Sequence, residues 1–177
     1  TSMPAGIRAT LGHGDHTGGV SALARRHRLA VFMTLGMRAA GKMHADFDVQ
    51  VIDGHSPFAV DDLEIHPYPV PHDARQPCQY VFHDGQRRLG VLSDAGCITP
   101  HIRSMLAPCD GLAVEFNHDR DMLARGPYPQ SLKTRVGGQL GHLSNCQSAG
   151  LLAEIGMARR QHLVLAQLSE PDDSQAP

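Results

Sequence analysis

A seven-residue stretch near the start of the chain, LGHGDHT at positions 11–17, constrains the fold more than any other feature. Two histidines and a carboxylate, His13, Asp15 and His16, fall within four positions, after a short apolar segment and before a pair of glycines. Histidine and aspartate are the side chains that hold zinc, manganese or iron at water-filled sites. Three such residues this close are hard to explain by core packing. The stretch therefore predicts a metal-binding loop between a strand and a helix, against the alternative of a polar loop with ordinary histidines.

Length and composition narrow the class of protein. A chain of 177 residues suits a single domain over 1–177, ending in a polar tail over 169–177. The hydrophobic set makes up 41% and charged residues 19%, which is typical of a globular chain. The formal net charge of -2 excludes an overall basic field directed at nucleic acid, although a local basic patch stays open. No apolar run approaches ~18 residues, so no membrane partner is expected.

The four cysteines form no C-x-x-C pair, which argues against a structural zinc knuckle. The start of the chain has no secretory hydrophobic region. Reduced thiols and a cytoplasmic location are the expectation.

Hydrophobic periodicity predicts a mixed α/β protein in three parts. Residues 7–11 and 30–33 are expected to be strands, and residues 18–29 and 35–43 helices, an order that implies a largely buried sheet. Residues 47–93 change to short period-two runs separated by turn residues, which predicts antiparallel strands over 49–52, 58–60, 63–70, 79–83 and 88–92. The rest is expected to contain helices over 100–106, 122–124, 131–136 and from Ser144 to about residue 156, with strands over 111–116 and 162–168.

Further ligand-type residues follow the predicted strands. His72 comes after the strand ending at Val70, and Asp94 comes after the strand ending at Leu92. Loop ends on one rim of a sheet are where α/β enzymes assemble their sites. Together with the first motif they predict a two-metal hydrolytic site. Each also has a plain structural reading, a solvated turn for His72 and a turn-capping aspartate for Asp94.

Two later segments each allow a functional and a structural interpretation. His142 lies just before a predicted helix N-terminus, where phosphate oxygens can sit, or it is a core or capping histidine. The polar segment 115–119, which includes Asn117 and His118, would either support metals and substrate or cap the next helix. The other histidines are expected at the surface or with satisfied partners: His27, His44, His55, His66, His83, His101 and His162.

The same residues resemble a known family. The run 13–16 is similar to the latter part of the H-x-H-x-D-H signature of the metallo-β-lactamase superfamily, and His72 and Asp94 fall where that superfamily keeps its third-motif histidine and bridging aspartate. The stretches 115–119, 126–133 and 141–145 resemble the YycJ/WalJ branch, bacterial enzymes similar to ribonuclease Z and the phosphoribosyl cyclic phosphodiesterases, with DNA exonuclease activity described. The resemblance covers about residues 9–170.

The resemblance implies an αβ/βα sandwich that binds two divalent ions, usually zinc or manganese. One ion would be held by His13, His72 and Asp94, and the other by Asp15, His16 and Asp94. The substrate would be a phosphodiester, including nucleic acid, attacked by a metal-bound water.

Roles for further residues follow from the same resemblance. Asp15 would orient the water, and His142 would stabilise charge on the scissile phosphate or protonate the leaving oxygen. Residues expected to face the substrate are Asn117, His118, Lys133 and Arg135, with solvated surface charge as the alternative for the last two.

The chain departs from the family pattern at three places. Leu11 replaces the first signature histidine, and Gln167 replaces the closing histidine, so each ion loses a ligand. The early strands of the family are also absent from this sequence. Part of one β-layer would then be missing, and the uncovered apolar surface would need a second copy of the chain or a further segment to complete the sheet.

Three functions therefore compete. The leading hypothesis is a metal-dependent phosphodiesterase or nuclease. The alternative is a catalytically impaired relative that works as a binding or scaffold protein, which Leu11 and Gln167 favour. A thiol-ester hydrolase of the glyoxalase type on the same fold is weaker, because the segments 117–119 and 141–145 do not suggest it.

Overall fold

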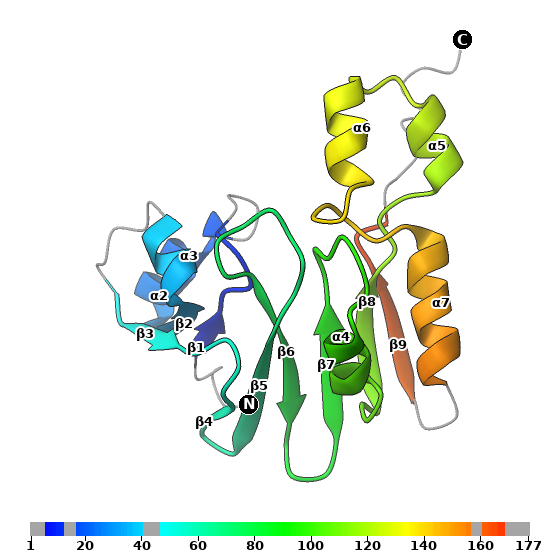
Figure 1. The fold of residues 1–177 in the computed structure, drawn as a ribbon. Coiled ribbons are helices and arrows are strands. Elements are labelled where there is room, and N and C mark those ends of the chain that lie inside the picture. Colours follow the sequence, from blue (N-terminus) through cyan, green and yellow to red (C-terminus); the bar gives the residue numbers. More distant parts are fainter. Residues whose placement is uncertain (1–5, 13–16, 41–46, 157–160, 169–177) are drawn as a thin grey trace.

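Two β-sheets lie between two helical layers in the computed structural model (Figure 1). The structure describes residues 6–12, 17–40, 47–156 and 161–168. The first sheet has the strand order β1-β2-β3 and the second the order β4-β5-β6-β7-β8-β9. Helices α2 and α3 contact the first sheet, whereas α4 and α7 contact the second. This arrangement confirms the expected αβ/βα sandwich. None of the described helices is long and apolar enough to cross a membrane.

The first sheet is parallel. Its strands are β1 (Gly6–Arg8), β2 (Ala30–Thr34) and β3 (Val49–Ile52), connected through helices α2 (Val20–His27) and α3 (Leu35–Ala40). The sequence analysis placed residues 49–52 in the antiparallel middle of the chain, and that prediction was wrong. A period-two pattern reports an extended backbone with two different faces but not the direction of its neighbour.

The second sheet begins as a meander and ends with crossovers. Strands β4 (Phe58–Val60), β5 (Leu63–Pro69), β6 (Cys78–His83) and β7 (Arg88–Leu92) pair antiparallel, as predicted. Strands β8 (Gly111–Glu115) and β9 (His162–Ala166) add in parallel after helices α4 (Pro100–Leu106) and α7 (Asn145–Ile155). The expected Asp84-Gly85 hairpin is present, with Asp84 Oδ1 accepting from two backbone N–H groups and Gly85 at φ +90°.

Side chains at the helix starts explain where the later helices begin. Ser144 caps α7, as the sequence predicted, and Gln147 completes a capping box with it. Thr99 caps α4, which the sequence analysis did not assign. Asp119 accepts hydrogen bonds from two backbone N–H groups of α5 (Arg120–Arg125), which precedes α6 (Gln130–Val136). The end of the polar segment 115–119 therefore caps a helix.

Apolar side chains form two clusters, one on each side of the six-stranded sheet. One cluster packs the first sheet and α2 against β5 and β6, and it contains Met33 and Tyr80. The other packs α4 and α7 against β5–β8, with Leu106 and Leu151 fully or almost fully buried. Burial of this kind on both faces supplies the main stabilisation of the sandwich.

The first sheet covers β5 and β6 on one face of the second sheet, but the described residues leave the β7–β9 part of that face uncovered. Leu89 on β7 is 47% exposed and Val164 on β9 is 57% exposed. The strand register places both on the face opposite α7, because Leu112 and Val114 point toward the helical cluster. The described residues therefore leave the expected apolar surface uncovered. It lies on β7 and β9, which the three-stranded first sheet does not reach.

Candidate metal centre

Four strands of the second sheet run in the same direction, so the segments that follow them meet at one edge. Strands β5 and β7 flank the antiparallel β6, and β8 and β9 are parallel to β7. His72 follows β5, Asp94 follows β7 and Gln167 follows β9. The segment before α7, which carries His142, reaches the same upper edge in Figure 1.

Three ligand-type side chains converge at this edge. Ligand atoms of His72, Asp94 and His142 all lie within 4.8 Å of one another. The three residues line a cavity of about 270 Å³ together with Asp73, Val136, Gly141 and Arg135. Two imidazoles and a carboxylate form a donor set typical of zinc and of other first-row metal sites.

A hydrogen bond from ring nitrogen Nδ1 fixes the orientation of the His72 side chain. Nδ1–H donates to the carbonyl oxygen of Gly141 at 2.9 Å, so the lone pair lies on Nε2. Nε2 is 3.3 Å from Asp73 Oδ1, and the other oxygen of Asp73 accepts from Arg135 Nε at 2.6 Å. A backbone carbonyl that orients an imidazole in this way is common around metal ligands.

Asp94 is buried and held in an unusual backbone conformation. Its φ of 54° lies in the left-handed region, which costs a non-glycine residue about 1–3 kcal/mol and is typical of functional sites. Ser93 Oγ donates to Oδ2 at 2.8 Å, and Gln167 Nε2 donates to Oδ1 at 2.9 Å. Both carboxylate oxygens are therefore oriented by neighbouring side chains.

Glu115 connects the loop that carries Asp94 with the segment that carries His142. Its side chain is fully buried at the end of β8. Oε2 accepts from the backbone N–H of Asp94, and Oε1 accepts from the backbone N–H groups of Ala95 and Leu143, each at 2.9–3.0 Å. His142 Nδ1 lies 3.2 Å from Oε2. One carboxylate therefore holds the loop after β7 and the segment before α7 in register.

This role of Glu115 was not assigned from the sequence beyond the general support expected of residues 115–119. The sequence did contain one indication of this role, an acidic residue at the end of an otherwise apolar strand. A glutamate that is buried there needs several hydrogen-bond donors around its carboxylate.

Electrostatics distinguish the two histidines near this carboxylate. The hydrogen bond to Glu115 raises the pKa of His142, against the opposing effect of burial, and Asp94 adds to the increase. Burial lowers the pKa of His118, and the charge of His142 lowers it further. His142 is therefore the imidazole better able to carry a proton at neutral pH.

The predicted site residues fall into three groups. The ligands expected from the first motif, His13, Asp15 and His16, lie outside the described residues. His72, Asp94, His142 and Arg135 line the same cavity.

The remaining predicted residues lie around this group. His118 is buried beside Asn117, whose backbone N–H donates to Leu143 O. Lys133 Nζ donates to the carbonyl oxygen of Ala124, and Lys133 is not among the described residues that line the cavity.

The two altered positions of the motif behave differently. Leu11 is completely buried, as its apolar side chain requires. Gln167 has φ 53° and directs its amide at Asp94, while its Oε1 is buried without a hydrogen-bond partner among the described residues. A buried amide oxygen with no donor beside a histidine and carboxylate cluster fits a site that accepts a cation.

The chain matches a known protein family over most of its length. Residues 4–164 match the family described as the beta-lactamase superfamily domain. The chain belongs to the metallo-β-lactamase superfamily. Within it, this metallo-β-lactamase-type chain is YycJ/WalJ-like, because curated members of that branch align over almost its whole length.

The curated relatives are exonucleases by name. The chain is 32% identical over 93% of its length to the exodeoxyribonuclease YycJ of Bacillus anthracis, and 27% identical over 94% to the exodeoxyribonuclease WalJ of Streptococcus pneumoniae serotype 2. It spans 64% of the length of each. The solved structure of Zn(2+)-bound PqqB from Methylobacterium extorquens has the same fold, with a TM-score of 0.71 and 20% sequence identity. The match covers 92% of this chain and 62% of that chain.

Proposed function

We propose that the protein is a metal-dependent phosphodiesterase that acts as a nuclease on DNA. The observation that carries the proposal is the convergence of His72, Asp94 and His142 on one polar cavity. The names of the YycJ and WalJ relatives support DNA as the substrate. A divalent metal is part of the proposal because the donor set fits one and the superfamily implies one. Zinc or manganese suits imidazole and carboxylate ligands.

In this proposal the metal ligands come from two parts of the chain. His72 and Asp94 are ligands from the described edge of the sheet, and His13, Asp15 and His16 complete a two-ion site. Divalent ions held there would polarise the phosphoryl oxygen and lower the pKa of the attacking water. Asp15 would orient that water.

The other cavity residues bind the substrate and move a proton. Arg135 lines the cavity with an exposed side chain, and its guanidinium can pair with a phosphate oxygen. The contact with Glu115 raises the pKa of His142, which favours this imidazole as the group that would donate a proton to the leaving oxygen.

The direct test combines metal analysis with a small phosphodiester. Purified protein is expected to contain two zinc or manganese ions per chain and to hydrolyse bis-p-nitrophenyl phosphate. Asp94→Ala should abolish hydrolysis and lower the metal content, whereas the exposed Asp62→Ala should change neither. A folded, metal-free and inactive protein would contradict the proposal and favour the binding or scaffold alternative.

That alternative rests on Leu11 and Gln167, which remove one imidazole from each ion. If the rest of the ligand geometry is intact, the double variant Leu11→His/Gln167→His should bind zinc at least about tenfold more tightly in calorimetry. An unchanged affinity would show that the site no longer assembles around a metal.

We also propose that the uncovered face of β7 and β9 mediates self-association. Leu89 and Val164 expose large apolar surfaces next to the edge strand β9. Sedimentation velocity should find a dimer or larger species, and Val164→Glu should shift it to the monomer. A monomeric wild-type protein at micromolar concentration would contradict self-association through this face.

A further inference from the structure

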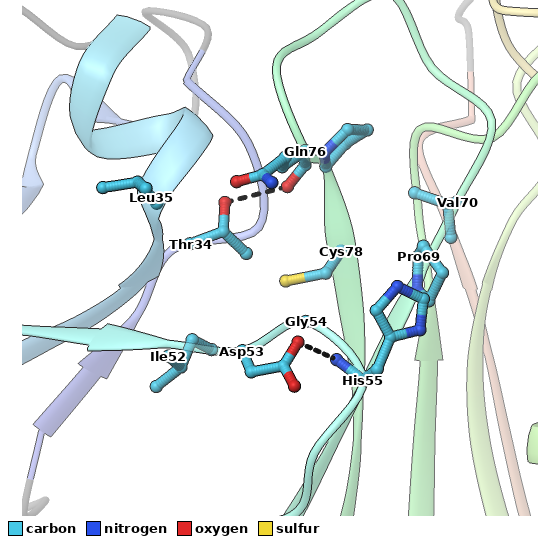
Figure 2. Close-up of a pocket in the computed structure, with 11 residues that line it drawn as sticks. Thr34, Leu35, Ile52, Asp53, Gly54, His55, Pro69, Val70, Gln76 and Cys78 are labelled. Carbon is cyan, nitrogen blue, oxygen red and sulfur yellow. Dashed lines mark hydrogen bonds between the residues drawn. The ribbon is translucent and has the colours of Figure 1, made fainter.

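A second cavity lies on the other side of the loop that carries His72. It measures about 300 Å³, and Figure 2 shows its lining. The lining residues come from the ends of β2, β3 and β5 and the start of β6.

The lining combines flat apolar walls with a few polar groups. Ile52 lies on one side of the opening, and Pro69 and the His55 ring lie on the other (Figure 2). The exposed carboxylate of Asp53 supplies a polar group, whereas the hydroxyl of Thr34 is hydrogen-bonded to Gln76 O. Small-molecule sites are typically apolar with a small number of placed polar groups, and about 300 Å³ is at the lower end of their range. The cavity therefore suits one flat ring system with hydrogen-bonding edges.

The charge of the cavity does not favour a phosphate. Hydrogen bonds from the hydroxyl of Ser56 and the backbone N–H of His55 lower the pKa of Asp53, so its carboxylate is ionised at neutral pH. No lysine or arginine occurs among the described lining residues. The metal-centre cavity differs because Arg135 lines it. The first cavity is therefore the better match for a phosphodiester, and the second for an uncharged group.

The loop over residues 70–77 forms a wall of both cavities. Val70 lines the second cavity and His72, two residues later, lines the first. Two residues span at most about 7 Å. The wall is fixed on the side of the first sheet, because Gly36 N–H donates to Gln76 Oε1 at 2.6 Å and Thr34 Oγ1 donates to Gln76 O at 2.9 Å.

We propose that this second cavity binds the base of the terminal deoxynucleotide of a DNA strand whose phosphodiester lies at His72, Asp94 and His142. The inference deepens the proposed nuclease function and rests on it. The base stacks against His55 and Pro69, and a base with an exocyclic amino group donates a hydrogen bond to Asp53.

Gly54 offers a way to fill the cavity without straining the backbone. A Cβ there would lie 3.6 Å from Thr34 Cγ2, and the backbone of Gly54 is not in the left-handed region. Gly54→Leu therefore places a side chain across the cavity, and Gly54→Ala gives a milder step. Gly150→Leu on the exposed side of α7 is the matched control, because its Cβ meets nothing within 4 Å.

Two chromogenic substrates separate base binding from phosphodiester cleavage. Gly54→Leu should raise KM for thymidine 5′-(p-nitrophenyl phosphate) by roughly tenfold, a factor within the range of base stacking. The same variant should leave hydrolysis of bis-p-nitrophenyl phosphate unchanged, and Gly150→Leu should affect neither. Equal effects of Gly54→Leu on both substrates, or no effect on either, would overturn the inference.

Binding of a nucleoside tests the cavity even if the protein cleaves nothing. Deoxyadenosine titrated into the full chain should shift the amide NMR signals of Gly54, His55 and Gln76, more weakly in Gly54→Ala, and should bind more tightly than thymidine. Inactivity toward bis-p-nitrophenyl phosphate with these shifts retained would refute the nuclease function alone. The absence of shifts in the wild-type protein would refute the base site.

Discussion

Replacing Glu115 with glutamine is the sharpest test of how the metal-ligand loops are held. The buried carboxylate accepts three backbone N–H groups and lies against His142 Nδ1. Glutamine has the same shape but only one acceptor oxygen. If that oxygen keeps the hydrogen bonds from the backbone N–H groups of Ala95 and Leu143, the new NH₂ group takes the place of Oε2. It then faces the N–H of Asp94, and the contact between the carboxylate and His142 is lost.

The cost can be worked from these contacts. One opposed buried N–H and one lost charged hydrogen bond, at about 1–3 kcal/mol each, give a loss of about 4 kcal/mol in the free energy of unfolding. For a chain of this length, that corresponds to a Tm lower by about 8–16 °C. The matched control is Glu154→Gln, because Glu154 is an exposed glutamate paired with Arg103, and its loss should stay within about 0.5 kcal/mol.

Urea titration followed by circular dichroism measures both variants under the same conditions. Glu115→Gln should also lose most hydrolysis of bis-p-nitrophenyl phosphate, because Asp94 and His142 are no longer held together. If the urea midpoint of Glu115→Gln equals that of Glu154→Gln, the hydrogen bonds to the Glu115 carboxylate do not stabilise the fold by the expected amount.

Two further outcomes follow from packing and burial. Gly96→Ala should destabilise the protein by about 1–3 kcal/mol or more in urea titration, because the added Cβ would lie 2.3 Å from the backbone of Gln139. Gly19→Ala is the control, because a Cβ there meets nothing within 4 Å and should not destabilise the protein. Equal urea midpoints for the two variants would refute the clash. Burial raises the pKa of the Cys78 thiol to about 11, so the thiol remains protonated at pH 8. A thiol reagent should therefore label the exposed Cys146 quickly and Cys78 only after unfolding. Rapid labelling of both cysteines in the native protein would contradict the burial of Cys78.

The sequence by itself determined the local structure and the location of most ligand-type residues. Periodicity and turn residues predicted nearly every described strand and helix, because side-chain burial repeats differently in the two. Ser144 was identifiable as a helix cap and Asp84-Gly85 as a hairpin, since both act within a few residues. His72 and Asp94 were identified because each directly follows an apolar strand.

Only the tertiary structure decided which residues meet. The parallel pairing of β3 depends on how α3 crosses the sheet, and the pattern of residues 49–52 cannot report it. The position of Glu115 between Asp94 and His142 depends on contacts 21 and 27 residues apart. The cavity beside Gly54 requires three strand ends from both sheets to face one another. Local sequence fixes backbone conformation, whereas hydrogen bonds and cavities between distant segments exist only once the sheets have packed.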